Sequence, residues 1–270
     1  MKHYSADNIR NIGLFSHGGA GKTSLAEAML FATGATTRLG KVEDGNTTTD
    51  FDVDEIKRHM SISLALAPLE FGDHKINVID VPGYADFLGE VQSTLAVVDA
   101  ALILLDGSAG VEVGSEKAWA LASEAGVPKI LFVNKMDRDN ADFGRTIESA
   151  RAMLGPMVGP LQLPIGSEKS FRGVADILSG RAYMFDDDNP GKSTETDIPD
   201  EFKRPVREAR GQLIEAAADS DEVLMERYLN DEEISDEELR HAVDVAIRNG
   251  DMVPVFAGAG SSMKGVDRLL

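Results

Sequence analysis

The chain has 270 residues, 43% of them hydrophobic, so it is long enough to bury a sizeable core as one domain with or without an insert. The absence of cysteine excludes disulfides, thiolate metal ligands and a cysteine nucleophile, and no apolar run reaches the length of a membrane helix. The net charge of −19 argues against sequence-specific nucleic-acid binding, and the polar start at residues 1–10 is unlike a secretion signal, so we expect a cytoplasmic protein that does not bind membranes.

Strand-like and helix-like segments alternate along most of the chain, which is typical of an α/β fold with a doubly wound, mostly parallel sheet. The expected strands lie near residues 9–15, 62–71, 75–80, 100–105, 129–134 and 253–257. The expected helices lie near residues 22–33, 85–97, 114–125 and 142–154. A long polar stretch at residues 34–60 is interpreted as a switch loop that is disordered until a γ-phosphate binds, and its run Thr47-Thr48-Thr49 as loop rather than a hydroxyl site.

The segment S-H-G-G-A-G-K-T-S at residues 16–24 joins the first strand to the first helix and has the residue types of a phosphate-binding loop. Small residues let backbone N–H groups close around phosphate oxygens, and the helix N-terminus adds its positive dipole. Lys22 would reach the terminal phosphates, and the Thr23 hydroxyl would bind Mg²⁺. We expect the nucleotide to contact His17, Gly18, Gly19, Ala20, Gly21, Lys22, Thr23 and Ser24. The alternative is an ordinary glycine-rich turn, because Ser16 replaces the first glycine of the strict pattern.

Two later strand ends supply the other parts of a nucleotide site. Asp80 ends one strand, where its carboxylate can hold Mg²⁺ through water, and Gly83 can offer its N–H to a γ-phosphate. Asn134, Lys135 and Asp137 follow another strand. The Asp137 carboxylate can accept two hydrogen bonds from the N1–H and amine of guanine, whereas adenine presents an acceptor there. This pattern favours GTP and GDP over a P-loop ATPase.

At these motifs the chain resembles the translational GTPases, and in particular the N-terminal GTPase domain of elongation factor G and its paralogues. The resemblance rests on N-I-G-L-F-S-H-G-G-A-G-K-T-S-L, D-V-P-G-Y-A-D-F, V-N-K-M-D-R and V-P-V-F-A-G-A-G-S-S-M-K-G-V, at residues 11–25, 80–87, 133–138 and 253–266. It implies a P-loop NTPase fold and a monomeric, Mg²⁺-dependent GTPase that works with the ribosome. In the last motif it implies that backbone N–H groups of Ala259 and Gly260 touch the guanine oxygen.

Three departures from the family pattern bear on chemistry. Gly19 stands where the family usually has an aspartate thought to hold a monovalent cation, which glycine cannot do. Ser61 replaces the threonine that binds Mg²⁺ in the GTP state, and its hydroxyl can serve in the same way. Tyr84 stands where the family has the catalytic histidine that positions the attacking water.

A neutral phenol can still orient water, because phosphoryl transfer depends mainly on positioning and charge stabilisation. We therefore predict slow intrinsic hydrolysis with Tyr84, Lys22 and Gly83 as the catalytic groups, and Thr23, Ser61 and Asp80 around Mg²⁺. Two alternatives stay open. Tyr84 can act only in packing, and the domain can be a GTP-dependent binding module whose hydrolysis is vestigial.

The GTP-binding domain is expected at residues 1–155, completed by 251–270, with an acidic insert at 156–250 and further domains after a helix that begins beyond Gly265. Residues 173–185 predict a hairpin with Ser179-Gly180 as its turn. Helical patterns follow at residues 200–219, 222–229 and 235–249, the last beginning with a capping box.

Residues 186–240 carry 19 Asp and Glu against 7 Lys and Arg, so the acid is concentrated in the insert. The resemblance implies that this subdomain meets the basic face of the ribosomal stalk protein. Charge reversal at Glu232, Glu233, Glu237 and Glu238 would then weaken stalk binding. The alternative is that these acidic faces are simply solvated.

Overall fold

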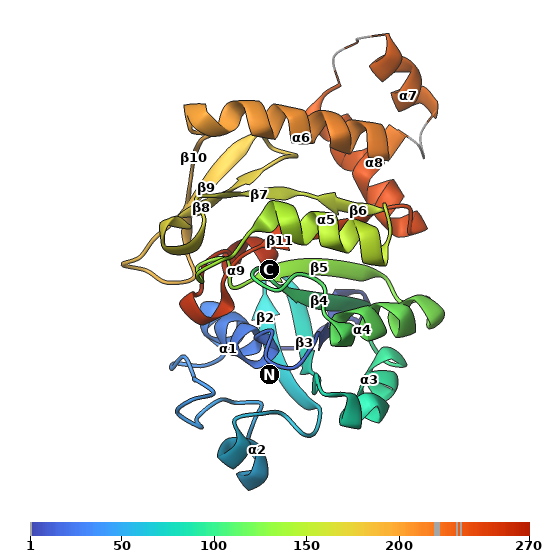
Figure 1. Ribbon diagram of the computed structural model, residues 1–270. Helices are drawn as coiled ribbons and strands as arrows, with labels where there is room; N and C mark the ends of the chain where they lie inside the picture. Colours follow the sequence, from blue (N-terminus) through green and yellow to red (C-terminus); the bar gives the residue numbers. More distant parts are fainter. Residues whose placement is uncertain (1, 219–221, 231, 233) are drawn as a thin grey trace.

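A computed structural model of the chain describes residues 2–218, 222–230, 232 and 234–270. Its main layer is a seven-stranded sheet in the order β2-β3-β1-β4-β5-β11-β6 (Figure 1). The strands are β1 (Ile9–Phe15), β2 (Ala65–Phe71), β3 (His74–Asp80), β4 (Ala100–Asp106), β5 (Lys129–Asn134), β6 (Val158–Pro160) and β11 (Val253–Ala257). All neighbours pair in parallel except β2 and β3, which form an antiparallel edge. The predicted α/β class with a mostly parallel sheet is confirmed.

Helices cover both faces of this sheet, and the side chains of β4 show how the two cores separate. Leu102 and Leu104 pack on one face, whereas Ile103 and Leu105 pack on the other, because successive strand side chains alternate. The first face is covered by α1 (Lys22–Ala32) and α9 (Val266–Leu269), and the second by α3 (Leu88–Leu95), α4 (Val113–Glu124) and α5 (Phe143–Leu154). The sheet is therefore buried on both sides, as a parallel sheet requires.

A smaller antiparallel sheet with three helices lies above the main sheet in Figure 1. Its strands are β7 (Gln162–Ile165), β8 (Gly173–Asp176), β9 (Arg181–Phe185) and β10 (Ser193–Asp197), and its helices are α6 (Asp200–Ala218), α7 (Glu222–Leu229) and α8 (Asp236–Asn249). The hairpin of β8 and β9 confirms the predicted turn, where Asp176 accepts the Ser179 N–H and Gly180 has a positive φ of 62°. The helices agree with prediction, except that residue 219 lies outside the described residues. The domain boundaries stay a prediction; β6, inside the predicted insert, pairs with β11 in the main sheet.

Two predicted elements are shorter than expected for local reasons. The strand predicted from residue 62 begins at Ala65, because the Ile62 and Ser63 N–H groups donate to the Glu55 carboxylate instead of to a neighbouring strand. The helix predicted from residue 85 begins as a 3₁₀ turn, Ala85–Phe87, before α3. Helix α2 (Val53–Arg58), which was not predicted, lies inside the predicted switch loop.

The loop between β9 and β10 reaches from the smaller sheet to the end of the main domain (Figure 1). Gly191 in this loop packs on buried Met263, since a Cβ at Gly191 would lie 2.5 Å from the Met263 methyl group. Ser193 donates to Asp267 at 2.5 Å, and the Arg268 guanidinium lies 3.7 Å from the centre of the Tyr183 ring. We call these three contacts the hairpin clasp; they join β9, β10 and the loop between them to Met263, in the loop after β11, and to α9.

No helix among the described residues combines the length and apolar character needed to cross a membrane.

Candidate nucleotide-binding site

The loops that follow β1, β3, β5 and β11 meet at the carboxyl edge of the main sheet, where parallel sheets bind ligands. A cleft of about 210 Å³ opens there. It is lined by Gly19, Gly21, Lys22, Thr23, Ser24, Val42, Glu43, Asp50, His59, Met60, Ser61, Tyr84, Asn134, Lys135, Arg138 and Ser261. A larger groove of about 830 Å³ between α5 and α6 contains none of the predicted site residues. Residues from the predicted phosphate loop, from Ser61 and from the Asn134-Lys135 pair therefore line one cleft.

The loop before α1 has a backbone that only glycine adopts easily. Gly19 and Gly21 have φ values of 84° and 97°. A Cβ at Gly21 would also lie 2.5 Å from Nδ2 of Asn134, so this position is closed to side chains. The next residue begins α1, whose N-terminal N–H groups and dipole favour an anion. The loop thus has the geometry of a phosphate site.

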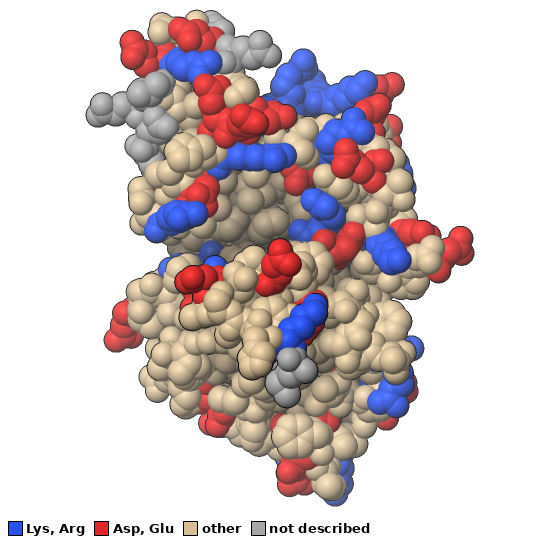
Figure 2. Space-filling model, turned by 180° about the vertical axis from the view of Figure 1, so that it is seen from behind, with Lys and Arg blue, Asp and Glu red and all other residues tan. Residues whose placement is uncertain are grey.

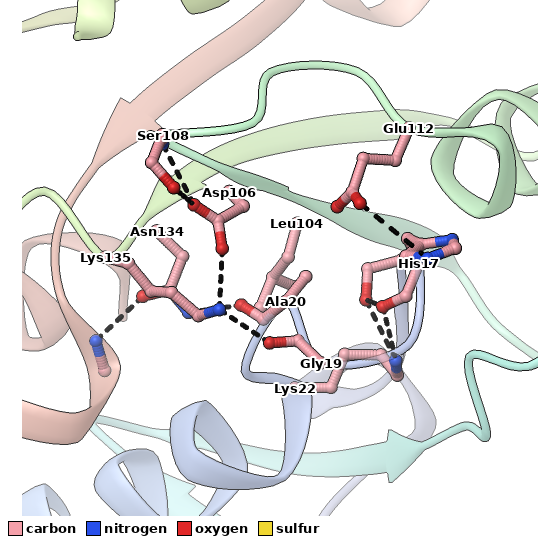
Figure 3. Close-up of polar contacts among 12 residues, drawn as sticks. His17, Gly19, Ala20, Lys22, Leu104, Asp106, Ser108, Glu112, Asn134 and Lys135 are labelled. Atoms are coloured by element: carbon pink, nitrogen blue, oxygen red, sulfur yellow. Dashed lines mark hydrogen bonds and ion pairs between the residues drawn. The ribbon is translucent and has the colours of Figure 1, made fainter. Parts of the chain in front are cut away.

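Lys22 is almost fully buried at 5% exposure, and its ammonium lies within this loop. Nζ donates to Oγ of Ser16 at 2.9 Å and to the His17 carbonyl at 3.4 Å (Figure 3). Burial lowers the pKa of Lys22 to about 8, and the nearby carboxylates of Asp80 and Asp50 oppose that effect. A Cβ at Gly83 would lie only 2.4 Å from Nζ, so glycine is needed where the loop after β3 covers the lysine.

Hydroxyl and carboxylate oxygens gather beside Lys22. The Thr23 hydroxyl donates to Oδ2 of Asp80 at 2.7 Å and lies 3.2 Å from Oγ of Ser61, which donates to Oδ1 of Asp50 at 2.7 Å. The second oxygens of both carboxylates, Oδ1 of Asp80 and Oδ2 of Asp50, are buried without a hydrogen-bond partner among the described residues. Burial raises the pKa of Asp80, and it raises the pKa of Asp50 to about 6.

This set of groups fits Mg²⁺, which prefers oxygen ligands and binds through one or two carboxylates with water. Two buried carboxylate oxygens without partners are costly, and a cation would satisfy them. Among the described residues no group of three or more His, Cys, Asp and Glu side chains could hold a metal, so hydroxyls and water would complete the shell. The predicted metal residues Thr23, Ser61 and Asp80 do come together.

The sequence analysis missed two residues of this cluster. Thr49, interpreted as loop, is buried at 1% exposure and donates to Oδ2 of Asp80 at 2.9 Å, so that interpretation is wrong for Thr49. Asp50 was not singled out at all. The sequence did carry a signal, the run Thr47-Thr48-Thr49-Asp50 within the switch loop. Three hydroxyls followed by a carboxylate are more typical of a site with oxygen ligands than of a simple connecting loop. The loop itself is folded in this structure, with the Gly40 N–H donating to Glu27 at 3.0 Å.

Asn134 and Lys135 connect the loops of the site. Asn134 donates from Nδ2 to the Ala20 carbonyl at 2.8 Å and accepts the Gly260 N–H at 2.9 Å. Lys135 donates to the Gly19 carbonyl and to Asp106, both at 2.6 Å (Figure 3). Burial alone would raise the pKa of Asp106, but the hydrogen bonds from Lys135 and Ser108 bring it below its usual value. Asn134 therefore links the phosphate loop to the loop after β11, and Lys135 links the phosphate loop to the end of β4.

Asp137 and the loop after β11 form the remaining side of the site. Oδ2 of Asp137 accepts the Ser262 hydroxyl at 2.7 Å, and Oδ1 is buried without a partner among the described residues. The N–H groups of Ala259 and Gly260 donate to the Lys264 carbonyl and to Asn134, each at 2.9 Å. The predicted contact of these two N–H groups with guanine stays a prediction, and it would require each of them to leave or share its present acceptor.

His17 belongs to the phosphate loop and Tyr84 lies beside it, and both residues line a second pocket. The Tyr84 side chain is 43% exposed and covers Gly18, where a Cβ would lie 2.8 Å from the ring. The second pocket has a volume of about 280 Å³. The His17 imidazole lies 3.7 Å from the Glu112 carboxylate on the far side of the loop (Figure 3). The His17 carbonyl accepts from Lys22 in the site, and the Tyr84 ring lies over the phosphate loop at Gly18 and lines the cleft.

Comparisons with known proteins agree with this geometry. The sequence profile described as the elongation factor Tu GTP binding domain matches residues 7–270. A solved crystal structure of a protein from Thermus thermophilus matches with a TM-score of 0.88 and 38% sequence identity. That match covers 97% of this chain and 39% of that chain, so this chain spans well under half the length of that protein. The resemblance to the translational GTPases is confirmed: the chain belongs to the family of elongation factor Tu GTP binding domains, and it is a GTP-binding GTPase domain.

Proposed function

We propose that this domain is the Mg²⁺-dependent GTPase switch of a ribosome-associated, elongation factor G-like translation factor that works as a monomer in the cytoplasm. The observation that carries the proposal is the meeting of Lys22, the Thr23–Asp80 pair and Asp137 at one edge of the sheet. The family match over residues 7–270 supports the guanine nucleotide. The alternative of a P-loop ATPase is opposed by Asp137, whose unpaired carboxylate oxygen suits the N1–H and amine of guanine.

Each group of the site has one task in this proposal. Lys22 and the backbone N–H groups of residues 18–23 bind the phosphates, with Ser24 beside them. Thr23, Ser61 and Asp80 hold Mg²⁺, and Asp50 accepts from Ser61 and from water in its shell. Mg²⁺ neutralises charge on the phosphates when bound. Asp137 binds the base, while Asn134 and Lys135 keep the two halves of the site together.

Turnover measurements test this function directly. GTP hydrolysis would be followed with and without ribosomes at saturating Mg²⁺, and again after chelation of Mg²⁺. We expect slow intrinsic hydrolysis, strong stimulation by ribosomes and loss of activity without Mg²⁺. Tight GTP binding with no stimulation would instead favour a GTP-dependent binding module.

Substitutions of Tyr84 distinguish an active GTPase from a GTP-dependent binding module. Its ring covers Gly18, so a phenolic hydroxyl can orient water near the γ-phosphate. We expect Tyr84→Phe to lower ribosome-stimulated turnover about tenfold or more, because one water-orienting hydrogen bond is lost, with nucleotide affinity unchanged. Tyr84→His should retain or raise turnover. Equal turnover in all three proteins would remove Tyr84 from the mechanism.

In this proposal the acidic insert binds the basic stalk protein. The four glutamates named for charge reversal differ in how cleanly they test that binding. Glu233 lies outside the described residues, and Glu232 and Glu238 are bound to Arg227. Glu238 also caps α8 through Ser235, which holds the pKa of its carboxyl at about 2, so reversing its charge would disturb the helix. Figure 2 shows acidic and basic side chains interspersed over this part of one face, as solvated ion pairs would be.

Glu237→Lys is therefore the sharper test of stalk binding. Glu237 is exposed in the first turn of α8, and none of the hydrogen bonds or ion pairs found in the described part of the chain uses its side chain. We expect its reversal to weaken binding of purified stalk protein about threefold to tenfold at low salt, and less at high salt, because surface charges are screened. Glu148→Lys on α5 is the control. Equal affinity for both variants and the parent would reject this face.

A further inference from the structure

Asp137 has one carboxylate oxygen committed to a neighbour and one left open. Oδ2 accepts the Ser262 hydroxyl at 2.7 Å, while Oδ1 is buried and has no partner among the described residues. A carboxylate that lacks a fixed partner turns about its last side-chain bond, whose rotational wells are broad. The Ser262 hydroxyl removes that freedom by holding one oxygen in place.

The Ser262 hydroxyl is itself held by a closed loop. Residues Gly260–Ser262 form a 3₁₀ turn, and Met263 follows it with a positive φ of 61°. Ala259 and Lys264 exchange backbone hydrogen bonds of 2.9 and 3.1 Å across the loop. Met263 is buried at 1% exposure against the hairpin clasp. The position of the Ser262 Oγ is therefore set by the fold.

We propose that Ser262 is a specificity-determining positioning residue, whose hydroxyl orients the Asp137 carboxylate so that it accepts two hydrogen bonds from guanine. This inference rests on the proposed guanine contact of Asp137. Ala259 at the start of this loop cannot donate from its side chain, so the hydroxyl comes from Ser262, three residues later. The Ser262 Oγ also lies 3.4 Å from the Ala259 carbonyl, but the 2.7 Å contact to Asp137 is the shorter one.

The test compares GDP with inosine diphosphate, which lacks the 2-amino group and so makes one fewer hydrogen bond to Asp137. Dissociation constants would be measured by calorimetry for the parent, Ser262→Ala and Ser262→Thr. We expect Ser262→Ala to weaken GDP about tenfold and inosine diphosphate about threefold, because GDP loses more bonds to a misoriented carboxylate. The preference for GDP thus falls about threefold. Ser262→Thr keeps the hydroxyl and should retain the parent's preference.

A structural defect in the loop would give a different result. It would weaken both nucleotides by the same factor, leave the preference unchanged and overturn the proposal. Ser262→Cys preserves the side-chain volume with a weak donor, so it should lose the preference even where Ser262→Ala lowers thermal stability. Asp137→Asn is a second comparison variant, which tests the guanine contact of Asp137 by itself. Unchanged GDP binding in that variant would defeat the guanine contact itself, whereas a loss there with no change in Ser262→Ala would defeat only the role of Ser262.

Discussion

Asp137→Asn is expected to convert the domain from a guanine-binding protein into a xanthine-binding one. The asparagine amide can accept from N1–H, but its NH₂ group faces the guanine amine, so one hydrogen bond is replaced by a clash of donors. Because a hydrogen bond to a charged group is worth about 1.5–3 kcal/mol, its loss should lower GDP affinity about tenfold to a hundredfold, and the clash of donors should lower it further. Xanthosine diphosphate carries an oxygen at that position and should gain affinity by a similar factor.

Calorimetric titration with both nucleotides measures this reversal. Asp139→Asn is a matched control, since Asp139 is an exposed carboxylate two residues later in the same loop. We expect it to bind GDP like the parent. GDP affinity that stays within threefold in Asp137→Asn would show that another group reads the base.

Lys22→Ala should have an effect of similar size on a different part of the ligand. The ammonium lies inside the phosphate loop and is nearly inaccessible to water, so a phosphate that replaces water there gains strong charge-assisted hydrogen bonds. Losing contacts to two phosphate groups, each about 1.5–3 kcal/mol, should weaken both GTP and GDP by at least about a hundredfold. The base preference should stay unchanged, because Asp137 is not altered.

Two readouts check the lysine prediction. Calorimetry gives the affinities, and with GDP at about ten times the parent's dissociation constant the rise in melting temperature should disappear, since a ligand stabilises the folded state by RT ln(1 + [L]/Kd). Lys203→Ala on α6 removes an exposed lysine paired with Asp200 and should behave like the parent. A GDP-induced rise that survives in Lys22→Ala would contradict the assigned phosphate role.

The main sheet could be predicted because its signals are local. Strands such as β4 and β5 are apolar runs bounded by polar turns, and the residues after them carry the motifs. The short strands β6 and β10 gave no such signal. β10 reads S-T-E-T-D without a hydrophobic face, and β6 forms only through pairing with β11, more than ninety residues later. Such non-local pairing leaves no trace in a short stretch of sequence.

The distinction between local signals and non-local contacts also applies to the residues of the site. Lys22, Asp80 and Asp137 belong to fixed spacings and were found. Ser262 acts through Asp137, 125 residues away in the chain, and a single sequence does not show that proximity. Asp50 accepts from Ser61, and the fold of the intervening loop, which the sequence pattern did not show, brings the two together. The missed helix α2 did carry a local signal, because Asp52 and Glu55 form a capping box at its start.

The hairpin clasp makes the two sheets energetically dependent on each other. Gly191 covers Met263, and Met263 is the neighbour of the serine that contacts Asp137. Free energies around a thermodynamic cycle must sum to zero, so if nucleotide binding shifts this loop, a macromolecule whose affinity depends on the loop's position must bind differently to the GDP-bound and empty domains. The nucleotide must then respond to that macromolecule by the same factor. A macromolecule that binds the smaller sheet and moves this loop would then change the nucleotide affinity without touching the nucleotide site.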